Sequence, residues 1–299
     1  MKNKNEILRL PEFLKTKIAS LDNDEYKKVR KILKENSLNT VCDGARCPNK
    51  CECYSSQTAT FLILGNTCTR NCAFCNISQK TPLGLDENEP KNVARAVEKL
   101  NIKYCVITSV TRDDLKENHD YGSIHFKKTI DEIRKLDSDI KTEVLTPDFK
   151  GDKVALDRII EARPDVFNHN IETIKSLYPI ARQMADYETT LDVLKYMKQN
   201  GLITKSGFML GLGESLEEIK ELILDLAKTG LDILTVGQYI RPSLKHLEVK
   251  KYYTNEEYLK IENFIKENTS ILPIVAPLAR SSYRAKEAYY KVLEEKCPR

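Results

Sequence analysis

Residues 61–77 read FLILGNTCTRNCAFCNI, and this stretch indicates both a fold and a chemistry. An apolar run ends at Gly65, and three cysteines follow at Cys68, Cys72 and Cys75 with the spacing C-x3-C-x2-C. A short apolar run bounded by glycine favours a buried strand, so the cysteines are expected in the loop after it. Three thiolates can hold three corners of an iron–sulfur cube and leave the fourth iron without a protein ligand. Such an iron can bind a small molecule and transfer an electron to it.

Other uses of three cysteines fit this spacing less well. Structural zinc usually has four closed ligands, whereas this loop supplies three, with no further Cys or His close behind. Clusters that only carry electrons usually have four cysteines. A disulfide framework needs an oxidising compartment, but the first residues, MKNKNEILRLPEFLK, are charged throughout and lack an apolar secretory segment. For a chain with nine cysteines, the expected location is therefore cytoplasmic.

Four more cysteines lie upstream within twelve residues, at Cys42, Cys47, Cys51 and Cys53. Buried free cysteines act as small hydrophobic residues, but these four occupy a polar segment that contains Asn, Lys and Glu. A second metal site is therefore predicted. The chemistry alone leaves three ligand sets open: Cys42, Cys47 and Cys53; Cys42, Cys47 and Cys51; or all four around zinc.

The downstream motif, with Phe74 before its last cysteine, resembles the signature of the radical S-adenosylmethionine (SAM) superfamily. In that superfamily a [4Fe–4S] cluster binds SAM through its open iron and cleaves it to a 5′-deoxyadenosyl radical. The resemblance implies that Cys68, Cys72 and Cys75 hold such a cluster and that SAM is a cofactor.

The upstream segment resembles the lipoyl synthase family within that superfamily. It matches the family motif C-x4-C-x5-C at Cys42, Cys47 and Cys53, and TATFLILGNTCTR follows. The resemblance implies that these three cysteines hold a second, auxiliary [4Fe–4S] cluster. Cys51 falls where the family usually has a small residue that is not a ligand.

The sequence RSSY at residues 280–283 matches the segment from which the family takes the fourth ligand of the auxiliary cluster, and the matching position is Ser282. A hydroxyl is a poor iron ligand beside thiolates. A weak ligand of this kind suits a cluster that must release one iron during turnover. Without the resemblance, these serines are more simply interpreted as the N-cap of a helix over 284–295.

From residue 58 onward, strand-like and helix-like segments alternate, which predicts an α/β fold with a parallel sheet and helical crossovers. About six units are visible, which suits the partial (β/α)6 TIM-like barrel that the resemblance to radical SAM enzymes implies. The barrel is expected over 58–240, with extensions over 1–57 and 241–299 capping its mouth. Strands are expected near 58–64, 103–110, 139–146, 166–171, 203–210 and 232–238, and helices near 24–36, 88–100, 125–137, 152–162, 187–200, 215–229, 255–268 and 284–295.

Two further motifs end predicted strands, where barrel enzymes place their sites. FNHNIET contains Asn170 and Glu172, and the resemblance implies that they contact the ribose and amino-acid parts of SAM. GFMLGLGE contains Gly207 and Gly211, and the resemblance implies a strand that passes close to the adenine, where glycine lets the backbone approach. Taken alone, these glycines also fit an ordinary strand end and turn. His169 is interpreted equally as a functional residue or as a buried, hydrogen-bonded structural one.

Charge and hydropathy exclude some classes of partner. The chain has 48 basic and 44 acidic residues, and this near balance does not indicate a nucleic-acid-binding protein. No apolar run approaches the roughly twenty residues of a membrane span.

Together the motifs imply a lipoyl synthase reaction. Two sulfur atoms, donated by the auxiliary cluster, enter at carbons 6 and 8 of an octanoyl chain held on a lysine of a carrier domain. The implied carriers are acyltransferase subunits of 2-oxoacid dehydrogenases and the glycine-cleavage H protein, and the implied reductant is a flavodoxin or ferredoxin. The upstream motif and RSSY argue against another sulfur-inserting radical SAM enzyme, such as biotin synthase. The six α/β units argue against a non-enzymatic zinc or electron-transfer module.

Overall fold

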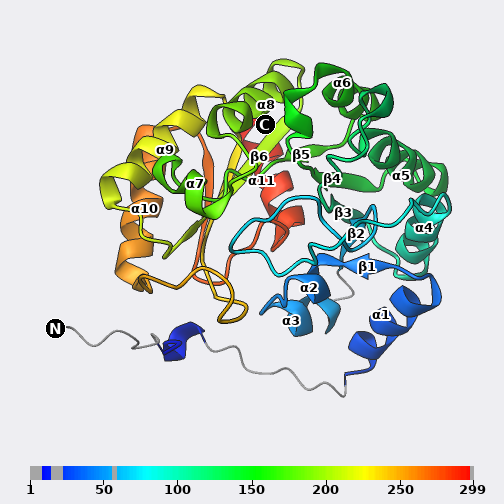
Figure 1. Ribbon diagram of the computed structural model, residues 1–299, viewed down its shortest axis with the longest axis horizontal. Coiled ribbons are helices and arrows are strands. Elements are labelled where there is room, and N and C mark those ends of the chain that lie inside the picture. The colour runs from blue at the N-terminus through cyan, green and yellow to red at the C-terminus, as the bar shows by residue number, and fades with distance from the viewer. Residues whose placement is uncertain (1–8, 15–22, 56–58, 297–299) are drawn as a thin grey trace.

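One eight-stranded sheet forms the core of an open barrel (Figure 1). The computed structural model describes residues 9–14, 23–55 and 59–296. The strands lie in the sheet in chain order; the first pairing is antiparallel and the other six are parallel. The strands are β1 (Asn39–Thr40), β2 (Thr60–Ile63), β3 (Tyr104–Ser109), β4 (Lys141–Leu145), β5 (Val166–Asn168), β6 (Ile203–Leu210), β7 (Ile233–Gln238) and β8 (Leu272–Val275). Because β1 and β8 form the two edges, the sheet is not closed, and the prediction of a partial barrel is confirmed.

Every connection between parallel strands contains a helix, and these helices cover the outside of the sheet (Figure 1). The crossover helices are α4 (Glu89–Lys99), α5 (Ser123–Leu136), α6 (Lys153–Ala162), α7 (Tyr178–Ala181), α8 (Tyr187–Gln199), α9 (Leu216–Lys228) and α10 (Asn255–Asn268). The other helical elements are α1 (Asp24–Glu35), α2 (Val41–Gly44), α3 (Lys50–Ser55), α11 (Ala285–Lys296) and the 3-10 turns η1 (Glu12–Leu14), η2 (Glu117–His119), η3 (Phe149–Gly151) and η4 (Lys175–Leu177). All six strands and all eight helices expected from the sequence are present, and β8 adds a further parallel strand.

Local sequence fixes where several helices begin. Ser215 caps α9 and Thr254 caps α10, and each forms a complete capping box with the glutamate three residues later. The side chain of Asn23 accepts hydrogen bonds from the first backbone N–H groups of α1. These caps satisfy N–H groups that have no partner within their own helix.

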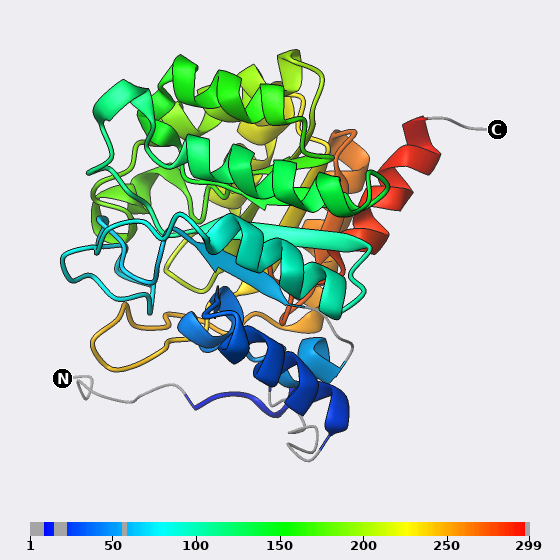
Figure 2. The ribbon, with the colours of Figure 1, turned by 90° about the vertical axis from the view of Figure 1, so that its right-hand side faces the viewer.

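The last helix, α11, lies at the end of the barrel opposite the loop that follows β2 (Figure 2). Its Ala285 and Tyr289 pack with Tyr104 and Val166, which begin β3 and β5. Its next apolar residues, Ala288 and Val292, pack with the first residues of β7 and β8. The sequence suggested that both extensions cap the mouth, but α11 closes the amino-terminal end instead, because residues 285, 288, 289 and 292 form one apolar helix face.

The segment that precedes α11 lies beside the N-terminal extension. Asn49 donates a hydrogen bond of 2.8 Å to the carbonyl of Leu278, and the Tyr283 hydroxyl donates one of 3.1 Å to Glu52 of α3. These contacts bring the upstream cysteines and the RSSY segment to the same place in the fold. Within residues 9–14, 23–55 and 59–296, no helix is long and apolar enough to cross a bilayer.

Candidate active site

The loop after β2 brings Cys68, Cys72 and Cys75 together at the carboxyl end of the barrel strands. Burial, together with the nearby Cys72 and Cys68, raises the pKa of Cys75 to about 12, so the three thiols lie within electrostatic reach of one another. Backbone N–H groups face the sulfur atoms: the N–H of Arg70 lies 3.4 Å from Cys68 Sγ, and the N–H of Ile77 lowers the pKa of Cys75. Hydrogen bonds of this kind accompany thiolate ligands of iron–sulfur clusters.

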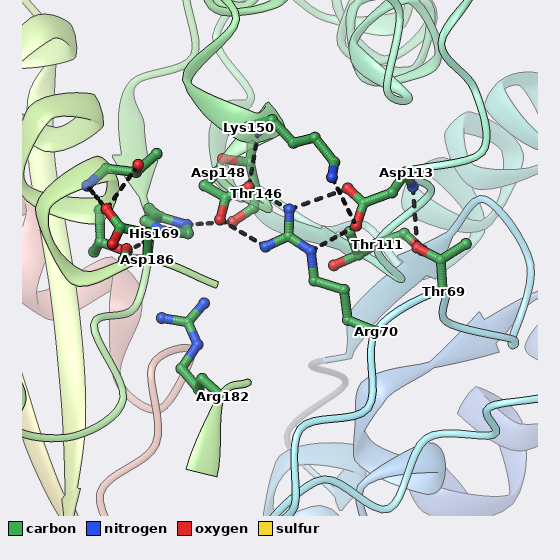
Figure 3. Close-up of polar contacts among 12 residues, drawn as sticks. Thr69, Arg70, Thr111, Asp113, Thr146, Asp148, Lys150, His169, Arg182 and Asp186 are labelled. Atoms are coloured by element: carbon green, nitrogen blue, oxygen red, sulfur yellow. Dashed lines mark hydrogen bonds and ion pairs between the residues drawn. The ribbon is translucent and has the colours of Figure 1, made fainter. Parts of the chain in front are cut away.

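Arg70, between the first two cysteines, is bound by two aspartates from neighbouring strand ends (Figure 3). Its Nε and Nη2 donate to Asp113, after β3, at 2.8 and 3.0 Å. Its Nη1 and Nη2 donate to Asp148, after β4, at 2.6 Å each. Both pairs are bidentate, which is the strongest geometry for an arginine and a carboxylate. The ion pairs therefore join the cysteine loop to the ends of two adjacent strands.

This clamp is shielded from solvent. The side chains of Arg70 and Asp148 are 4% and 3% exposed. Burial alone would raise the pKa of Asp148, but the Arg70 guanidinium holds it well below the usual range. The nearby Arg112 instead pairs with Asp114, whose side chain is 40% exposed. Arg70 is therefore the cation that fixes the loop. Its role was not visible in the sequence, because its partners lie 43 and 78 residues away.

Asn170 and Glu172 lie just beyond β5, next to the cysteine loop. Asn170 donates a hydrogen bond of 3.1 Å to Glu172, and its side-chain oxygen accepts one of 2.9 Å from Ser281. Burial raises the pKa of Glu172, while Arg182 opposes that shift. Glu172 also has a φ of 68°, a strained conformation that is common at functional sites. The structure thus places two predicted contact residues in one polar cluster and adds Ser281 to it.

Arg182 is a buried cation at the same site that sequence reasoning missed. Its Nη1 donates to the carbonyls of Asn170 and Ile171 and to the Tyr178 hydroxyl. Its Nε is buried and has no hydrogen-bond partner among the described residues. Burial raises the pKa of Cys72, and the charge of Arg182 opposes that rise. Arg182 lies beside Cys72 and has an unused N–H donor at Nε, so it is suited to bind the carboxylate of a small molecule. The only sequence signal was a lone cation after the apolar run LYPIA.

The two glycines of β6 and its turn are required by contacts within the chain. A Cβ on Gly207 would lie 3.1 Å from the Thr235 carbonyl and 3.2 Å from Asn170 Oδ1. Gly211 has a φ of 103°, and a Cβ there would lie 2.2 Å from the Gln238 amide. These neighbours explain why side chains are excluded; contact with adenine stays a prediction. The carboxylate of Glu214 closes the turn by accepting the N–H groups of residues 211–213.

His169 has a structural role. Its Nδ1 lies 2.8 Å from the Thr146 carbonyl, so Nδ1 carries the proton, and Nε2 lies 3.3 Å from the Thr190 hydroxyl. Burial lowers the pKa of His169 to about 4. The ring is therefore neutral at physiological pH and its two nitrogens are occupied.

Three of the upstream cysteines act on one another electrostatically. The pKa of Cys53 is raised to about 12 by burial and then by Cys42 and Cys47, and Cys47 also acts on Cys42. Cys42, Cys47 and Cys53 therefore lie within electrostatic reach of one another, which matches the triplet that the resemblance implied.

Ser282 lies next to this triplet and does not cap α11. It lines the same cavity as Cys53, and α11 begins three residues later, at Ala285. The first helical N–H of that region, from Ala288, bonds to the carbonyl of Arg284, so Arg284 occupies the cap position. The alternative interpretation of the serines as a helix cap is therefore wrong for Ser282.

Both donor sets fit iron–sulfur clusters. Each has three adjacent thiols, and backbone N–H groups act on the sulfurs of Cys42, Cys47 and Cys75. Within the part of the chain that the structure describes, no three His, Cys, Asp or Glu side chains are arranged around a single metal ion. Arg280 interacts electrostatically with both Cys47 and Glu172, so this buried arginine lies between the two sites.

Comparisons with known proteins agree with this geometry. The model of the radical SAM superfamily matches residues 62–226, and a model of the N-terminal domain of lipoyl synthase matches residues 1–47. The chain is 47% identical over 279 residues to lipoyl synthase from Caldicellulosiruptor saccharolyticus, covering 93% of this chain and 96% of that protein. It is 45% identical to lipoyl synthase from Sulfolobus acidocaldarius, covering 94% and 96%.

Two solved structures share the fold. Streptococcus suis SuiB bound to S-adenosylmethionine matches with a TM-score of 0.55 and 14% identity, over 77% of this chain and 55% of that one. Methylornithine synthase (PylB) matches with a TM-score of 0.55 and 13% identity, over 83% and 74%.

Proposed function

The chain belongs to the lipoyl synthase family of the radical SAM superfamily, and we propose that it inserts two sulfur atoms, at carbons 6 and 8, into an octanoyl chain carried on a protein lysine. The observation that carries this proposal is the pair of cysteine triplets, with the buried Arg280 between the two sites. When bound, the cluster on the downstream triplet and SAM supply the radical that removes hydrogen, and the auxiliary cluster supplies sulfur.

The downstream site is suited to bind SAM. Cys68, Cys72 and Cys75 would hold the cluster, and the free Nε of Arg182 is placed to receive the carboxylate of SAM. Asn170 and Glu172 are the candidates for its ribose and amino group. Gly207 and Gly211 would let the backbone approach the adenine.

A cavity beside the cysteine loop is large enough for a small molecule, but it is separate from the proposed SAM contacts, because Asn170, Glu172, Gly207, Gly211 and Arg182 do not line it. It measures about 700 Å³, and its walls include Ala73, Leu212 and Leu247. Backbone hydrogen bonds from Ala73 to Ala181 and from Leu247 to Ala73 fix two of its walls against the cysteine loop. Small-molecule sites are usually apolar clefts of roughly 300–1,000 Å³ with a few placed polar groups.

At the upstream site, Cys42, Cys47, Cys53 and Ser282 would hold the auxiliary cluster. Three of these ligands come from the N-terminal extension and the fourth from the segment before α11, and the Asn49–Leu278 hydrogen bond holds the two segments together. An oxygen ligand holds iron less firmly than sulfur does, so Ser282 would hold its corner of the cluster least firmly.

The substrate is a protein-bound octanoyl group, and we assign the finer partners by the family. These are the acyltransferase subunits of 2-oxoacid dehydrogenases, the glycine-cleavage H protein and a flavodoxin or ferredoxin as reductant, and the location is the cytoplasm.

Paired variants test the division of roles. Cys72→Ala should abolish both SAM cleavage and sulfur insertion, whereas Cys47→Ala should retain SAM-dependent formation of 5′-deoxyadenosine and lose the lipoyl product. Iron analysis should find about half of the wild-type iron in each variant. A Cys47→Ala enzyme that still makes lipoyl product would refute the auxiliary site as the sulfur source.

A further inference from the structure

The segment that follows β8, residues 276–283, runs past the carboxyl end of β7. The N–H of Gln238, the last residue of β7, donates a hydrogen bond of 3.0 Å to the carbonyl of Pro277. The segment lies so close to this strand that a Cβ on Gly237 would be 2.2 Å from the carbonyl oxygen of Ala279. Only glycine allows a backbone to approach another strand so closely. The position of the segment is therefore built into β7.

Two consecutive serines of this segment face different sites. Ser281 donates a hydrogen bond of 2.9 Å to Oδ1 of Asn170, and a Cβ on Gly207 would lie 3.5 Å from the same hydroxyl oxygen. Ser282 lines the cavity that Cys53 also lines. Because adjacent Cα atoms are only about 3.8 Å apart, a shift of one serine displaces the other. The segment thus contacts the proposed SAM site with one residue and the auxiliary site with the next.

The Ser281 hydroxyl fixes the direction in which the Asn170 amide faces. Nδ2 of Asn170 donates a hydrogen bond of 3.1 Å to Glu172, and an ionised carboxylate can only accept hydrogen bonds. Ser281 supplies a donor to the other end of the amide, Oδ1. Without this donor, one of the two hydrogen bonds that hold the amide in its plane is lost. Ser281, Asn170 and Glu172 therefore form one ordered chain of hydrogen bonds.

Building on the proposed function, in which Asn170 and Glu172 contact SAM, we propose that Ser281 is a positioning residue for SAM that ties the orientation of Asn170 to the state of the auxiliary site. In a chain whose auxiliary site is assembled, iron restrains Ser282, and Ser281 stays within reach of Asn170. In a chain whose auxiliary site is empty, that restraint is absent and Asn170 is held less well. SAM therefore binds best to chains that can supply sulfur.

SAM binding without a reductant tests the positioning role, because no turnover occurs. Equilibrium dialysis of radiolabelled SAM against anaerobically reconstituted protein measures the Kd. Ser281→Ala should raise the Kd by about threefold to tenfold, the effect of one lost hydrogen bond, and should keep the wild-type iron content. Ser281→Thr retains the hydroxyl and should restore the wild-type Kd. Tyr283→Phe removes the hydrogen bond from the same segment to Glu52; it is the matched control and should leave the Kd unchanged.

A double-mutant cycle tests the link to the auxiliary site. Cys47→Ala should raise the Kd for SAM by about threefold, within the range of coupling energies between linked residues. In the Ser281→Ala background, the same substitution should add no further increase, because the link is already cut. Saturating SAM should still give 5′-deoxyadenosine in Cys47→Ala, since only the affinity changes.

Each part of the proposal has a result that would overturn it. An unchanged Kd in Ser281→Ala, or an equal increase in Tyr283→Phe, would remove the positioning role. Loss of iron from Ser281→Ala would assign Ser281 to the auxiliary site alone. Additive effects of Ser281→Ala and Cys47→Ala would refute the link between the sites. All of these results leave the proposed function intact, whereas wild-type holoenzyme that binds no SAM would contradict the proposed function itself.

Discussion

The guanidinium of Arg70 binds the carboxylate of Asp148 through two hydrogen bonds of 2.6 Å, across 78 residues of sequence. This pair, with the one to Asp113, joins the cysteine loop to the ends of β3 and β4 (Figure 3). The loop is thereby positioned by the barrel itself. The buried ion pairs of Arg70 therefore hold in place the loop whose three thiols would bind one cluster.

Arg70→Lys should weaken the SAM cluster selectively. A lysine ammonium cannot reproduce two bidentate pairs, and breaking a buried ion pair costs about 3–5 kcal/mol. The variant should lose iron from the SAM cluster, show an altered electron paramagnetic resonance signal and raise the KM for SAM, while the auxiliary cluster remains. Arg112→Lys, equally buried but paired with the exposed Asp114, is the control. Equal iron loss in both variants would show that Arg70 has only a general structural role.

His169 should contribute stability that depends on pH. Its pKa is lowered from 6.5 to about 4 in the folded chain, so between these values the unfolded chain binds the extra proton. Stability from this group is complete above pH 6.5 and falls as the pH decreases, by about 2 kcal/mol between pH 7.5 and 5. Urea unfolding at both pH values should show a smaller pH dependence for His169→Gln. An unchanged difference would mean that the ring does not stay neutral in the folded chain.

Cys51 and Cys53 should respond differently to substitution. Cys53 interacts with Cys42 and Cys47, whereas Cys51 falls where the family usually has a small residue that is not a ligand. Cys51→Ala should therefore keep full iron content and activity, and Cys53→Ala should lose auxiliary iron. Iron and sulfide analysis of the two anaerobically purified variants decides this. The opposite pattern would place the ligand at Cys51.

Ser282 should matter for chemistry more than for stability. Because Arg284 occupies the cap position of α11, Ser282→Ala should change the free energy of unfolding by less than the roughly 1 kcal/mol of a lost cap, yet it should lose the two-sulfur product. Ser282→Cys should bind the fourth iron more firmly and turn over poorly. Normal sulfur insertion by Ser282→Cys would argue that this corner does not open.

The sequence predicted most elements because their periodicity and caps are local signals. The capping boxes at Ser215 and Thr254 mark α9 and α10 correctly. The sequence did not predict β8, because it has four residues and contains Pro273, which is typical of edge strands, and β8 is an edge.

Long-range contacts set the limits of prediction at the site. The spacing of the cysteines is a local signal, so both triplets were visible in the sequence. Contacts between distant segments determine three features of the site: the partners of Arg70, the unpaired Nε of Arg182 and the position of α11. Residue patterns alone do not predict contacts between distant segments. The apolar face of α11 is visible in the sequence, but the sequence does not indicate which end of the barrel that face covers.

Mass spectrometry of an octanoyl-lysine carrier peptide, after anaerobic incubation with the protein, SAM and a reductant, tests the central claim most directly. The account predicts a product that has gained two sulfur atoms, formed together with 5′-deoxyadenosine, and no such product from Cys47→Ala. A peptide that gains no sulfur while 5′-deoxyadenosine accumulates would contradict it.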